Sequence, residues 1–414
     1  MKHILLLTAL VAANQLLAQT FNKIVYNSDN SGLPHNTIRC IAIDTNDNVW
    51  VGTQQGGVAR FDGEDWSVWN TANSNLPGNN IIVVQPLENG EVWISTIIST
   101  STIPYRISKL YENNVTNWSG VTNGYDIVDA FDYYDNKVYI STFNGMYTYK
   151  NNIFSPFNTG DGCIPSKFVS DILFVSPDKY WVAASNYDGS GMAGLLQIEQ
   201  DICTVYNNSN SGFPSNNTTV DLKKDKDNPD KVWLRTNAGV TSFDGTAWEV
   251  FAAPGTSLPN SYAIDSFGDI WVAYIFHGLQ KYDGAWHYYQ NLVNDGVNAL
   301  AIDSHNNLWI GTQNSGLIKL VSVLTSTTGI SIAQSVKCYP TVFREELYIE
   351  QDQDRTLSWV LMDINGKVAA QEQFTGHKAT ISLAGYKIPS GAYFYCIKNA
   401  DNDLIQTGKL LKAE

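Results

Sequence analysis

The chain has 414 residues, of which 43% are hydrophobic, 12% aromatic and only 16% charged, a composition that supports a large buried core. Its formal net charge of -14 and the lack of any basic run argue against nucleic acid or an anionic membrane as a partner, because phosphate binding requires clustered Lys and Arg. The five Cys show neither a CxxC motif nor metal-ligand spacing, so we expect no metal and no cofactor.

Residues 1–18 are the first expected segment, a secretory signal peptide. Lys2 and His3 precede an apolar stretch from Ile4 to Ala13, which is too short to span a bilayer. No later segment is apolar enough for a membrane-spanning helix. The sequence therefore predicts export and cleavage after Ala18.

Residues 19–323 contain a repeat and are expected to form one domain. Each period holds four short segments rich in Val, Ile and aromatic residues, divided by clusters of Asn, Asp, Gly and Ser. One strand aromatic marks each of seven units, with separations of 43, 46, 42, 52, 38 and 38 residues. These aromatics are Trp50, Trp93, Tyr139, Trp181, Trp233, Trp271 and Trp309. Four strands per period predict an all-β fold, a seven-bladed β-propeller.

The two ends of the repeat predict how the propeller closes. Phe21 to Asn27 matches the outer strand of a blade, whereas the last unit runs into a Ser/Thr-rich stretch without an outer strand. We expect the N-terminal strand to complete the seventh blade, which would leave no exposed sheet edge.

Several conspicuous residues are expected to be structural. Asp44, Asp265 and Asp303 should close the turn between the first two strands of their units, and the strand Trp residues should pack between blades. Two cysteine pairs, Cys163 with Cys203 and Cys338 with Cys396, could form disulfides, and the sequence leaves both open.

The repeats resemble a known family, the two-component regulator propeller repeat. The resemblance rests on Leu-Pro-x-Asn, the Asp turn, the Trp-Ile/Val-Gly-Thr strand and the Phe-Asp-Gly corner. That family is best known from periplasmic sensor domains of hybrid histidine kinases, some of which detect glycan fragments. This chain carries no kinase motif, so the resemblance does not imply signalling. A more distant resemblance is to streptogramin lyase, another seven-bladed propeller.

Residues 324–334 are an expected linker, and residues 335–414 an expected second domain. Seven short strands with turns at Asn365-Gly366 and Ser390-Gly391 predict a small Ig-like β-sandwich. The predicted strands are Val336 to Tyr339, Glu346 to Glu350, Leu357 to Asp363, Val368 to Phe374, Ala379 to Leu383, Ala392 to Lys398 and Leu404 to Leu411.

This second domain resembles the type A C-terminal sorting domain of the bacterial type IX secretion system. The matching motifs are Tyr339-Pro340, Met362 to Lys367, Ile388 to Phe394 and Gly408 to Lys412, while Thr341-Val342 stands where the family usually has Asn-Pro. The resemblance implies the type IX machinery as a partner, and a mature protein that is secreted or attached to the outer-membrane surface. The alternative is an Ig-like domain that binds a ligand itself.

Candidate ligand-binding residues lie in two sets of loops. The loops entering the innermost strands and the loops between strands two and three should meet at one end of the propeller. They are rich in amides, hydroxyls and aromatic rings, which suit a hydroxylated ligand such as a glycan. The candidates are Asn36, Gln54, Asn80, Asn144, Asn237, Tyr274, His277 and Gln313.

Two insertions on the same end extend this site. Thirteen residues separate Trp93 from Arg106 and Trp181 from Gly194, against six or seven in regular units. The inserted segments, Ile97 to Arg106 and Ser185 to Ala193, could form a wall over one sector or could be neutral changes in surface loops. They add four candidates, Tyr105, Arg106, Tyr187 and Asp188.

The sequence predicts a secreted or cell-surface binding propeller for a glycan or another polar ligand. No catalytic residue is identified, because Gly-x-Ser-x-Gly, His-Glu-x-x-His and a phosphate-binding loop are all missing. One alternative is a metal-dependent lyase or hydrolase of the streptogramin-lyase type, for which only His35 and His277 are placed near the expected face. The other is a surface adhesion scaffold that binds a protein through an apolar patch.

Overall fold

The computed structural model describes residues 19–98, 105–118, 121, 127–158, 163–164, 168–184, 194–214, 219–226, 228–253, 259–289, 292–293, 295–324, 336–340, 342–351, 354, 356–362, 368–398 and 404–413. The expected signal peptide, residues 1–18, lies outside these described residues. The chain divides into two compact units, one of Asn22–Val321 and one that includes Ser322–Glu414. Within the described part, no helix has the length and apolar character to cross a membrane.

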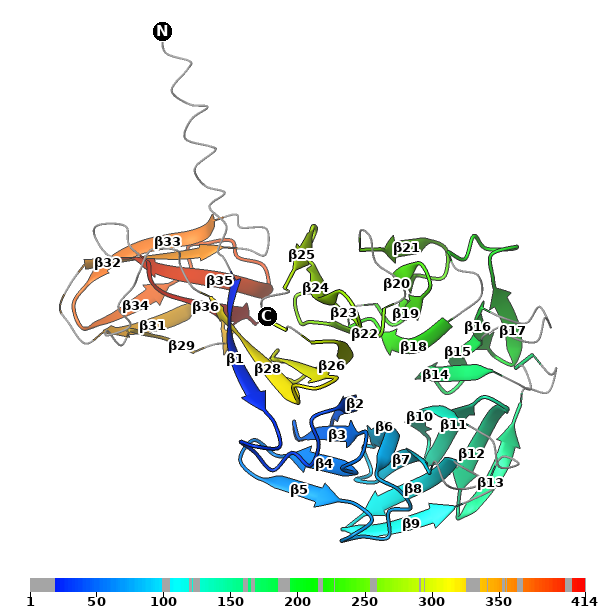
Figure 1. Ribbon diagram of the computed structural model, residues 1–414. Helices are drawn as coiled ribbons and strands as arrows, with labels where there is room; N and C mark the ends of the chain where they lie inside the picture. The colour runs from blue at the N-terminus through cyan, green and yellow to red at the C-terminus, as the bar shows by residue number, and fades with distance from the viewer. Residues whose placement is uncertain are drawn as a thin grey trace. The chain divides into compact units, whose positions relative to one another are not determined.

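The Asn22–Val321 unit is built from four-stranded sheets that follow one another along the chain (Figure 1). Six of them are antiparallel, with their strands in chain order. The first sheet contains β2 (Ile38–Ile43), β3 (Val49–Thr53), β4 (Val58–Phe61) and β5 (Trp66–Trp69), and the second contains β6 (Asn80–Pro86), β7 (Val92–Ile97), β8 (Tyr105–Tyr111) and β9 (Asn114–Trp118). The third contains β10 (Val128–Tyr134), β11 (Lys137–Thr142), β12 (Gly145–Lys150) and β13 (Ile153–Phe157), and the fourth contains β14 (Val169–Ser176), β15 (Lys179–Ala184), β16 (Gly194–Glu199) and β17 (Ile202–Tyr206). The fifth contains β18 (Thr219–Lys224), β19 (Val232–Thr236), β20 (Gly239–Phe243) and β21 (Trp248–Phe251), and the sixth contains β22 (Ser261–Ile264), β23 (Ile270–Tyr274), β24 (Gly278–Tyr282) and β25 (Trp286–Tyr288).

The last sheet of this unit combines both ends of the repeat. Its strand order is β1 (Gln19–Tyr26), β28 (Leu317–Leu324), β27 (Leu308–Thr312) and β26 (Val297–Ile302). The N-terminal strand thus takes the outer position predicted for it. Gly316, just before β28, has a φ of +86°, and a Cβ there would collide with the Tyr26 carbonyl oxygen, so this junction requires glycine.

Aspartate turns and tryptophans form a repeated module at one end of the sheets. Asp303 lies between β26 and β27, and its Oδ1 accepts hydrogen bonds from the backbone N–H groups of His305 at 3.1 Å and Asn307 at 2.8 Å. Its Oδ2 accepts a hydrogen bond from Trp309 Nε1 at 2.9 Å. The same Asp–Trp bond recurs from Trp50 to Asp44 and from Trp271 to Asp265. The predicted turn role is confirmed, and the bond to the indole is an addition that the sequence did not suggest.

The strand tryptophans pack between neighbouring sheets, as predicted. Trp50 of β3 shares a buried cluster with Ile81 and Val84 of β6. Trp309 of β27 shares another with Ile38 and Val51 of the first sheet. Burial of such large side chains on both faces of each sheet supplies the main stabilising free energy of the unit.

One of the two possible disulfides forms. Cys163 precedes β14 and is joined to Cys203 of β17, on the outer edge of the same sheet. Cys338 and Cys396 are free thiols, so the second possible pairing is wrong. The reason is strand alternation: Tyr395 and Ile397 belong to the core of the C-terminal unit, whereas Cys396 between them lies on the opposite face. Cys338 packs against that core from another sheet.

The C-terminal unit contains two sheets. One has the order β29 (Val336–Tyr339), β31 (Glu346–Gln351) and β34 (Lys378–Ser382). The other has the order β30 (Val342–Phe343), β36 (Leu404–Lys412), β35 (Gly391–Lys398), β32 (Thr356–Met362) and β33 (Val368–Thr375). The seven strands predicted here form to within one residue at each end, and β30, which pairs in parallel with β36, is an additional strand.

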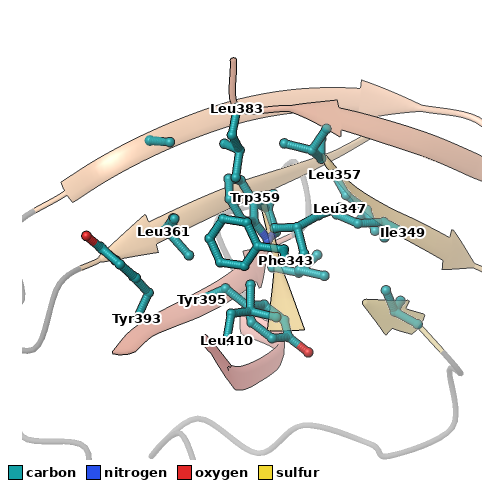
Figure 2. Close-up of a cluster of buried hydrophobic side chains, with 14 residues drawn as sticks. Phe343, Leu347, Ile349, Leu357, Trp359, Leu361, Leu383, Tyr393, Tyr395 and Leu410 are labelled. Carbon is teal, nitrogen blue, oxygen red and sulfur yellow. The ribbon is translucent and has the colours of Figure 1, made fainter. Parts of the chain in front are cut away.

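The two sheets of the C-terminal unit share one apolar core (Figure 2). Trp359 of β32 is fully buried and lies among Phe343, Leu347 and Leu410, which come from strands of both sheets. Tyr393 lies at the border of the core, where its hydroxyl donates a hydrogen bond to the Pro389 carbonyl oxygen at 2.9 Å. The alternation of buried and exposed residues along β31 is typical of a strand with one face on such a core.

The Asp–Trp module predicts a large effect of one aspartate on stability. Asp303→Ala should lower the free energy of unfolding by about 2–4 kcal/mol, because the buried Trp309 indole and two backbone N–H groups lose their acceptor. Urea denaturation measures this loss. Asp62→Ala is the matched control, since Asp62 also accepts two backbone hydrogen bonds but lies in an exposed hairpin where water replaces it. Equal losses in the two variants would contradict the assigned role of the buried module.

Candidate functional site

Threonines at the ends of second strands shape the loops that carry two predicted site residues. Thr53 Oγ1 donates to the Gly57 carbonyl oxygen at 2.8 Å, and Thr312 Oγ1 does the same to Gly316 at 2.8 Å. The loop held by Thr53 carries Gln54, whose backbone N–H donates to the Thr37 carbonyl oxygen at 3.0 Å. In the first sheet, the segment that enters β2 and the loop between β3 and β4 therefore lie side by side.

A pocket of 650 Å³ opens beside these two segments, and we call it the mouth pocket. Its lining residues are Thr37, Arg39, Gln54, Ile82, Arg235, Asn260, Asn298, Gln313 and Asn314. They come from the first, second, fifth, sixth and last sheets of the Asn22–Val321 unit and from the segments that enter them. Two guanidinium groups and five carboxamides dominate the lining, and none of its described residues is Asp or Glu.

Side chains of the mouth pocket also connect neighbouring sheets. Asn298 Nδ2 of β26 donates to the Ile38 carbonyl oxygen of β2 at 2.8 Å, and Asn260 Nδ2 donates to the Val297 carbonyl oxygen at 3.1 Å. Arg235 Nη1 of β19 donates to the Pro259 carbonyl oxygen at 2.6 Å. These bonds give three backbone carbonyls a side-chain donor, and they fix the positions of the pocket walls.

A second cavity of 510 Å³ adjoins the mouth pocket, with which it shares Ile82 and Arg235, and we call it the inner cavity. Residues of β2, β6, β10, β14 and β18, the first strands of five sheets, line it together with Arg235. Its ionisable side chains are Asp129, Asp132, Asp171, Asp221, Lys223, Arg235 and the Cys40 thiol.

A β-bulge at the same place in these first strands produces the lining. The register of pairing shifts at Arg39 in β2, at Ile82 in β6 and at Asn298 in β26. It shifts likewise at Asp129 in β10 and at Ser170 in β14, while in β18 the irregularity encloses Asp221, whose φ is +60°. Every one of these bulge residues lines the mouth pocket or the inner cavity. A bulge redirects one side chain without disturbing the rest of the strand, so it exposes this position in each sheet.

The inner cavity perturbs the titration of its carboxyl groups. Desolvation raises the pKa of Asp129 to about 7 and that of Asp132 to about 6. Desolvation also raises the pKa of Asp171 well above its usual range, although its Oδ2 accepts a hydrogen bond from the Leu222 N–H at 2.7 Å. Burial lowers the pKa of Arg235, a shift that the nearby Asp221 and Asp129 oppose.

The structure brings two of the twelve predicted site residues into the mouth pocket, Gln54 and Gln313. Asn36 instead stabilises the loop before β2, because its Oδ1 accepts a hydrogen bond from the Ser28 N–H at 2.8 Å. Asn80 begins β6, and its buried Oδ1 has no hydrogen-bond partner among the described residues. Asn237 is exposed in the turn between β19 and β20.

The remaining predicted residues lie apart from the mouth pocket or outside the described part. Tyr274, at the end of β23, is only 1% exposed, and its ring lies 6.1 Å from that of His277. Asn144 belongs to the turn after β11, where its N–H donates to Thr142 Oγ1. Arg106 lies in β8, and Tyr105 begins that strand, with a side chain outside the description. Tyr187 and Asp188 lie outside the described residues, as does the whole Ser185–Ala193 insertion.

The described residues provide no group of three or more His, Cys, Asp or Glu side chains arranged to hold a metal ion. His35 takes part in its own loop, since its Nδ1 accepts a hydrogen bond from the Thr37 N–H at 3.0 Å. His277 Nδ1 is buried without a partner among the described residues.

The sequence analysis missed Thr37, Arg39, Arg235, Asn260 and Asn298, which line the mouth pocket, and all the acidic residues of the inner cavity. A signal for part of this set existed. A buried β-branched residue precedes the bulge in Ile38-Arg39, Val128-Asp129 and Val297-Asn298. Aligning the repeats on that residue would have identified the position after it.

Two segments of the chain, residues 32–55 and 291–314, match the family model of the two component regulator propeller. No curated protein sequence matches the chain. The fold is similar to the extracellular domain of a hybrid two component system from B. thetaiotaomicron, with a TM-score of 0.57 and 15% identity over 94% of this chain and 57% of that one. A second such domain from the same organism gives a TM-score of 0.54 and 15% identity over 95% and 59%.

The fold is also similar to virginiamycin B lyase from Staphylococcus aureus, with a TM-score of 0.56 and 12% identity over 74% of this chain and 100% of that one. At this identity the likeness concerns the fold alone. The chain spans less than two thirds of the length of the two B. thetaiotaomicron domains. Together with the four-stranded sheets, these matches define the Asn22–Val321 unit as a β-propeller, two segments of which match the two component regulator propeller.

The raised pKa of Asp129 predicts how stability depends on pH. A carboxyl group whose pKa is raised on folding binds its proton more tightly in the folded state, so its contribution lowers the free energy of unfolding as the pH rises from about 4 to about 7. Asp129→Asn removes this contribution and should stabilise the protein at pH 8 by on the order of 1 kcal/mol, after allowance for screening by water in the cavity.

Urea denaturation of the wild type and of the Asp129→Asn variant at pH 5 and pH 8 tests this expectation. The variant should gain clearly more at pH 8 than at pH 5, where only the first part of the pH-dependent loss has occurred. Asp178→Asn is the matched control, because that residue lies in the turn between β14 and β15 and does not line the inner cavity. A gain of equal size at both pH values would show that Asp129 acts through packing and not through its charge.

Proposed function

We propose that this protein is an extracellular binding protein that takes a polar ligand, foremost a glycan, in the mouth pocket. The observation that carries the proposal is the lining of that pocket, where five carboxamides and two guanidinium groups surround a volume of 650 Å³ and no Asp or Glu is found among the described residues. Convergent hydrogen-bonding side chains at one end of a propeller suit a ligand rich in hydroxyl groups. Similarity of the fold to extracellular domains of two component systems supports a location outside the cytoplasm.

We further propose that the propeller has seven blades and that the N-terminal strand closes it. Seven four-stranded sheets and the position of β1 in the last of them support this proposal. Bonds between the last and first sheets support it as well: Asn298 Nδ2 donates to the Ile38 carbonyl oxygen, and the Ser304 N–H donates to Asp47 Oδ1 at 3.0 Å.

Export is the third part of the proposal. A signal peptide at residues 1–18 and a type IX sorting domain at residues 335–414, of Ig-like form, would carry the protein to the cell surface or the medium. The sequence motifs that resemble the sorting family support this part, and so does the compact C-terminal unit with its two sheets around one core.

Ligand binding is tested by the thermal unfolding of the purified protein in the presence of neutral and acidic oligosaccharides, peptides and divalent cations. A ligand that binds only the folded state raises the melting temperature by mass action. We expect a rise with one class of saccharide, and a loss of about ten-fold in affinity in the Gln54→Ala/Gln313→Ala variant. Asn237→Ala, in an exposed loop away from the pocket, should leave binding unchanged. A response to peptides alone would favour the adhesion scaffold, and one to divalent cations alone the lyase.

Ring closure is tested by comparing two asparagines with equivalent roles. Asn260→Ala removes the bond between the sixth and last sheets, and Asn298→Ala removes the bond between the last and first sheets. If the first and last sheets are packed as firmly as any other pair, both variants should lose about 1–2 kcal/mol in urea denaturation. A loss in Asn260→Ala with none in Asn298→Ala would argue that the ring is open at that junction.

A further inference from the structure

The charge of the residues that line the mouth pocket is opposite in sign to the net charge of the whole chain. The formal net charge of the protein is -14, yet the ionisable groups that line the mouth pocket are two arginines, Arg39 and Arg235. The carboxyl groups gather in the inner cavity next to it. A positive site in an otherwise acidic protein repels most cations and accepts an anion, so the contrast selects for ligand charge.

Arg39 is available to a ligand. It occupies the bulge position of β2 and is exposed, and its guanidinium group forms no hydrogen bond or ion pair with any residue that the structure describes. A guanidinium group offers five N–H donors in a planar fork that matches a carboxylate.

Arg235 is the second, more deeply placed guanidinium. Its Nη1 is bound to the Pro259 carbonyl oxygen, which fixes the side chain across two sheets. Its Nε is buried and has no acceptor among the described residues. A fixed cation with spare donors needs little reorganisation to bind an anion, and this lowers the entropic cost of binding.

The rest of the lining suits the hydroxyl groups of a sugar. The Gln54 and Gln313 carboxamides and the Thr37 hydroxyl offer both donors and acceptors. Asn260 and Asn298 direct their NH2 groups to backbone carbonyls, so their Oδ1 atoms remain as acceptors. A volume of 650 Å³ accommodates a short oligosaccharide.

We propose that the mouth pocket binds an acidic oligosaccharide, with a uronate carboxylate on Arg39 and Arg235 and with sugar hydroxyls on Gln54 and Gln313. The inference rests on the proposed function and adds the charge of the ligand to it. It assigns recognition of the anion to Arg39, at the bulge of β2, and to Arg235 of β19 in the fifth sheet.

The test uses the full-length purified protein and matched pairs of probes. Trimers of galacturonate, glucuronate and mannuronate are titrated by calorimetry, each beside its fully methyl-esterified form, in buffer free of phosphate and sulfate. Esterification removes the charge and leaves the hydroxyl groups in place. We expect one uronate trimer to bind at least ten-fold more tightly than its ester, and this affinity to fall as NaCl is raised.

The Arg39→Gln variant removes the charge of this side chain and is expected to leave the fold unchanged. We expect it to weaken the binding of the uronate trimer about ten-fold or more, and to weaken the binding of the ester, which has lost only a neutral hydrogen-bond donor, much less. Arg60→Gln is the matched control, because Arg60 lies in β4 next to Asp62 and does not line the mouth pocket. Circular dichroism and the melting temperature confirm that both variants are folded.

The outcomes distinguish this inference from the proposed function. Equal binding of a trimer and its ester, or unchanged affinity in Arg39→Gln, would overturn the acidic ligand while the saccharide function stands. Binding of neutral saccharides alone would do the same. Failure of every acidic, esterified and neutral saccharide would overturn both.

Discussion

The unpaired edge of the innermost strands is the constraint on which the propeller depends. Each four-stranded sheet leaves one edge of its first strand without a partner strand, and backbone groups there must still be hydrogen-bonded. Side chains from the neighbouring sheet meet part of this need: Asn298 and Asn260 cap backbone carbonyls, Arg235 caps another, and the Asp171 carboxylate accepts the Leu222 N–H. The same residues line the mouth pocket or the inner cavity, so polar groups that hold the sheets together also create the surface a ligand would meet.

The two ends of the sheets differ in how much their residues vary between units. At one end, an Asp carboxylate binds the indole of a strand Trp in the first, fifth, sixth and last sheets, as Asp44 and Asp303 show. At the other end, β-bulges place Arg39, Asp129 and Asn298 at equivalent positions with three different chemistries. Because a bulge aims one side chain inward without altering the packed residues beside it, this position can change without loss of the core.

Burial and charge act together in the centre of the unit. Desolvation raises the pKa values of Asp129 and Asp132, so the inner cavity carries less negative charge near neutral pH than its composition suggests. Arg235 lines both cavities, and the other residues that line the mouth are Arg39, five carboxamides, Thr37 and Ile82. The centre therefore has an interior lined by carboxyl groups and a mouth whose described ionisable residues are arginines.

Local sequence determined the elements of this protein, and tertiary structure decided the site. The repeat period and the hydrophobic pattern predicted the strands, the Asp44 and Asp303 turns, the packing of Trp50 and the outer position of β1. Each of these features depends on contacts within one repeat or between adjacent repeats. The same reasoning selected Gln54 and Gln313, which line the mouth pocket. It missed Arg39, Arg235 and Asp129. At Arg39 and Asp129 a bulge interrupts the two-residue alternation that predicts which face of a strand a side chain lies on. In addition, a cavity joins residues of sheets that are far apart in the chain. The free thiols of Cys338 and Cys396 illustrate the same limit, since only the packed sheets show that Cys338 lies against the core while Cys396 lies on the face of another sheet that points away from it.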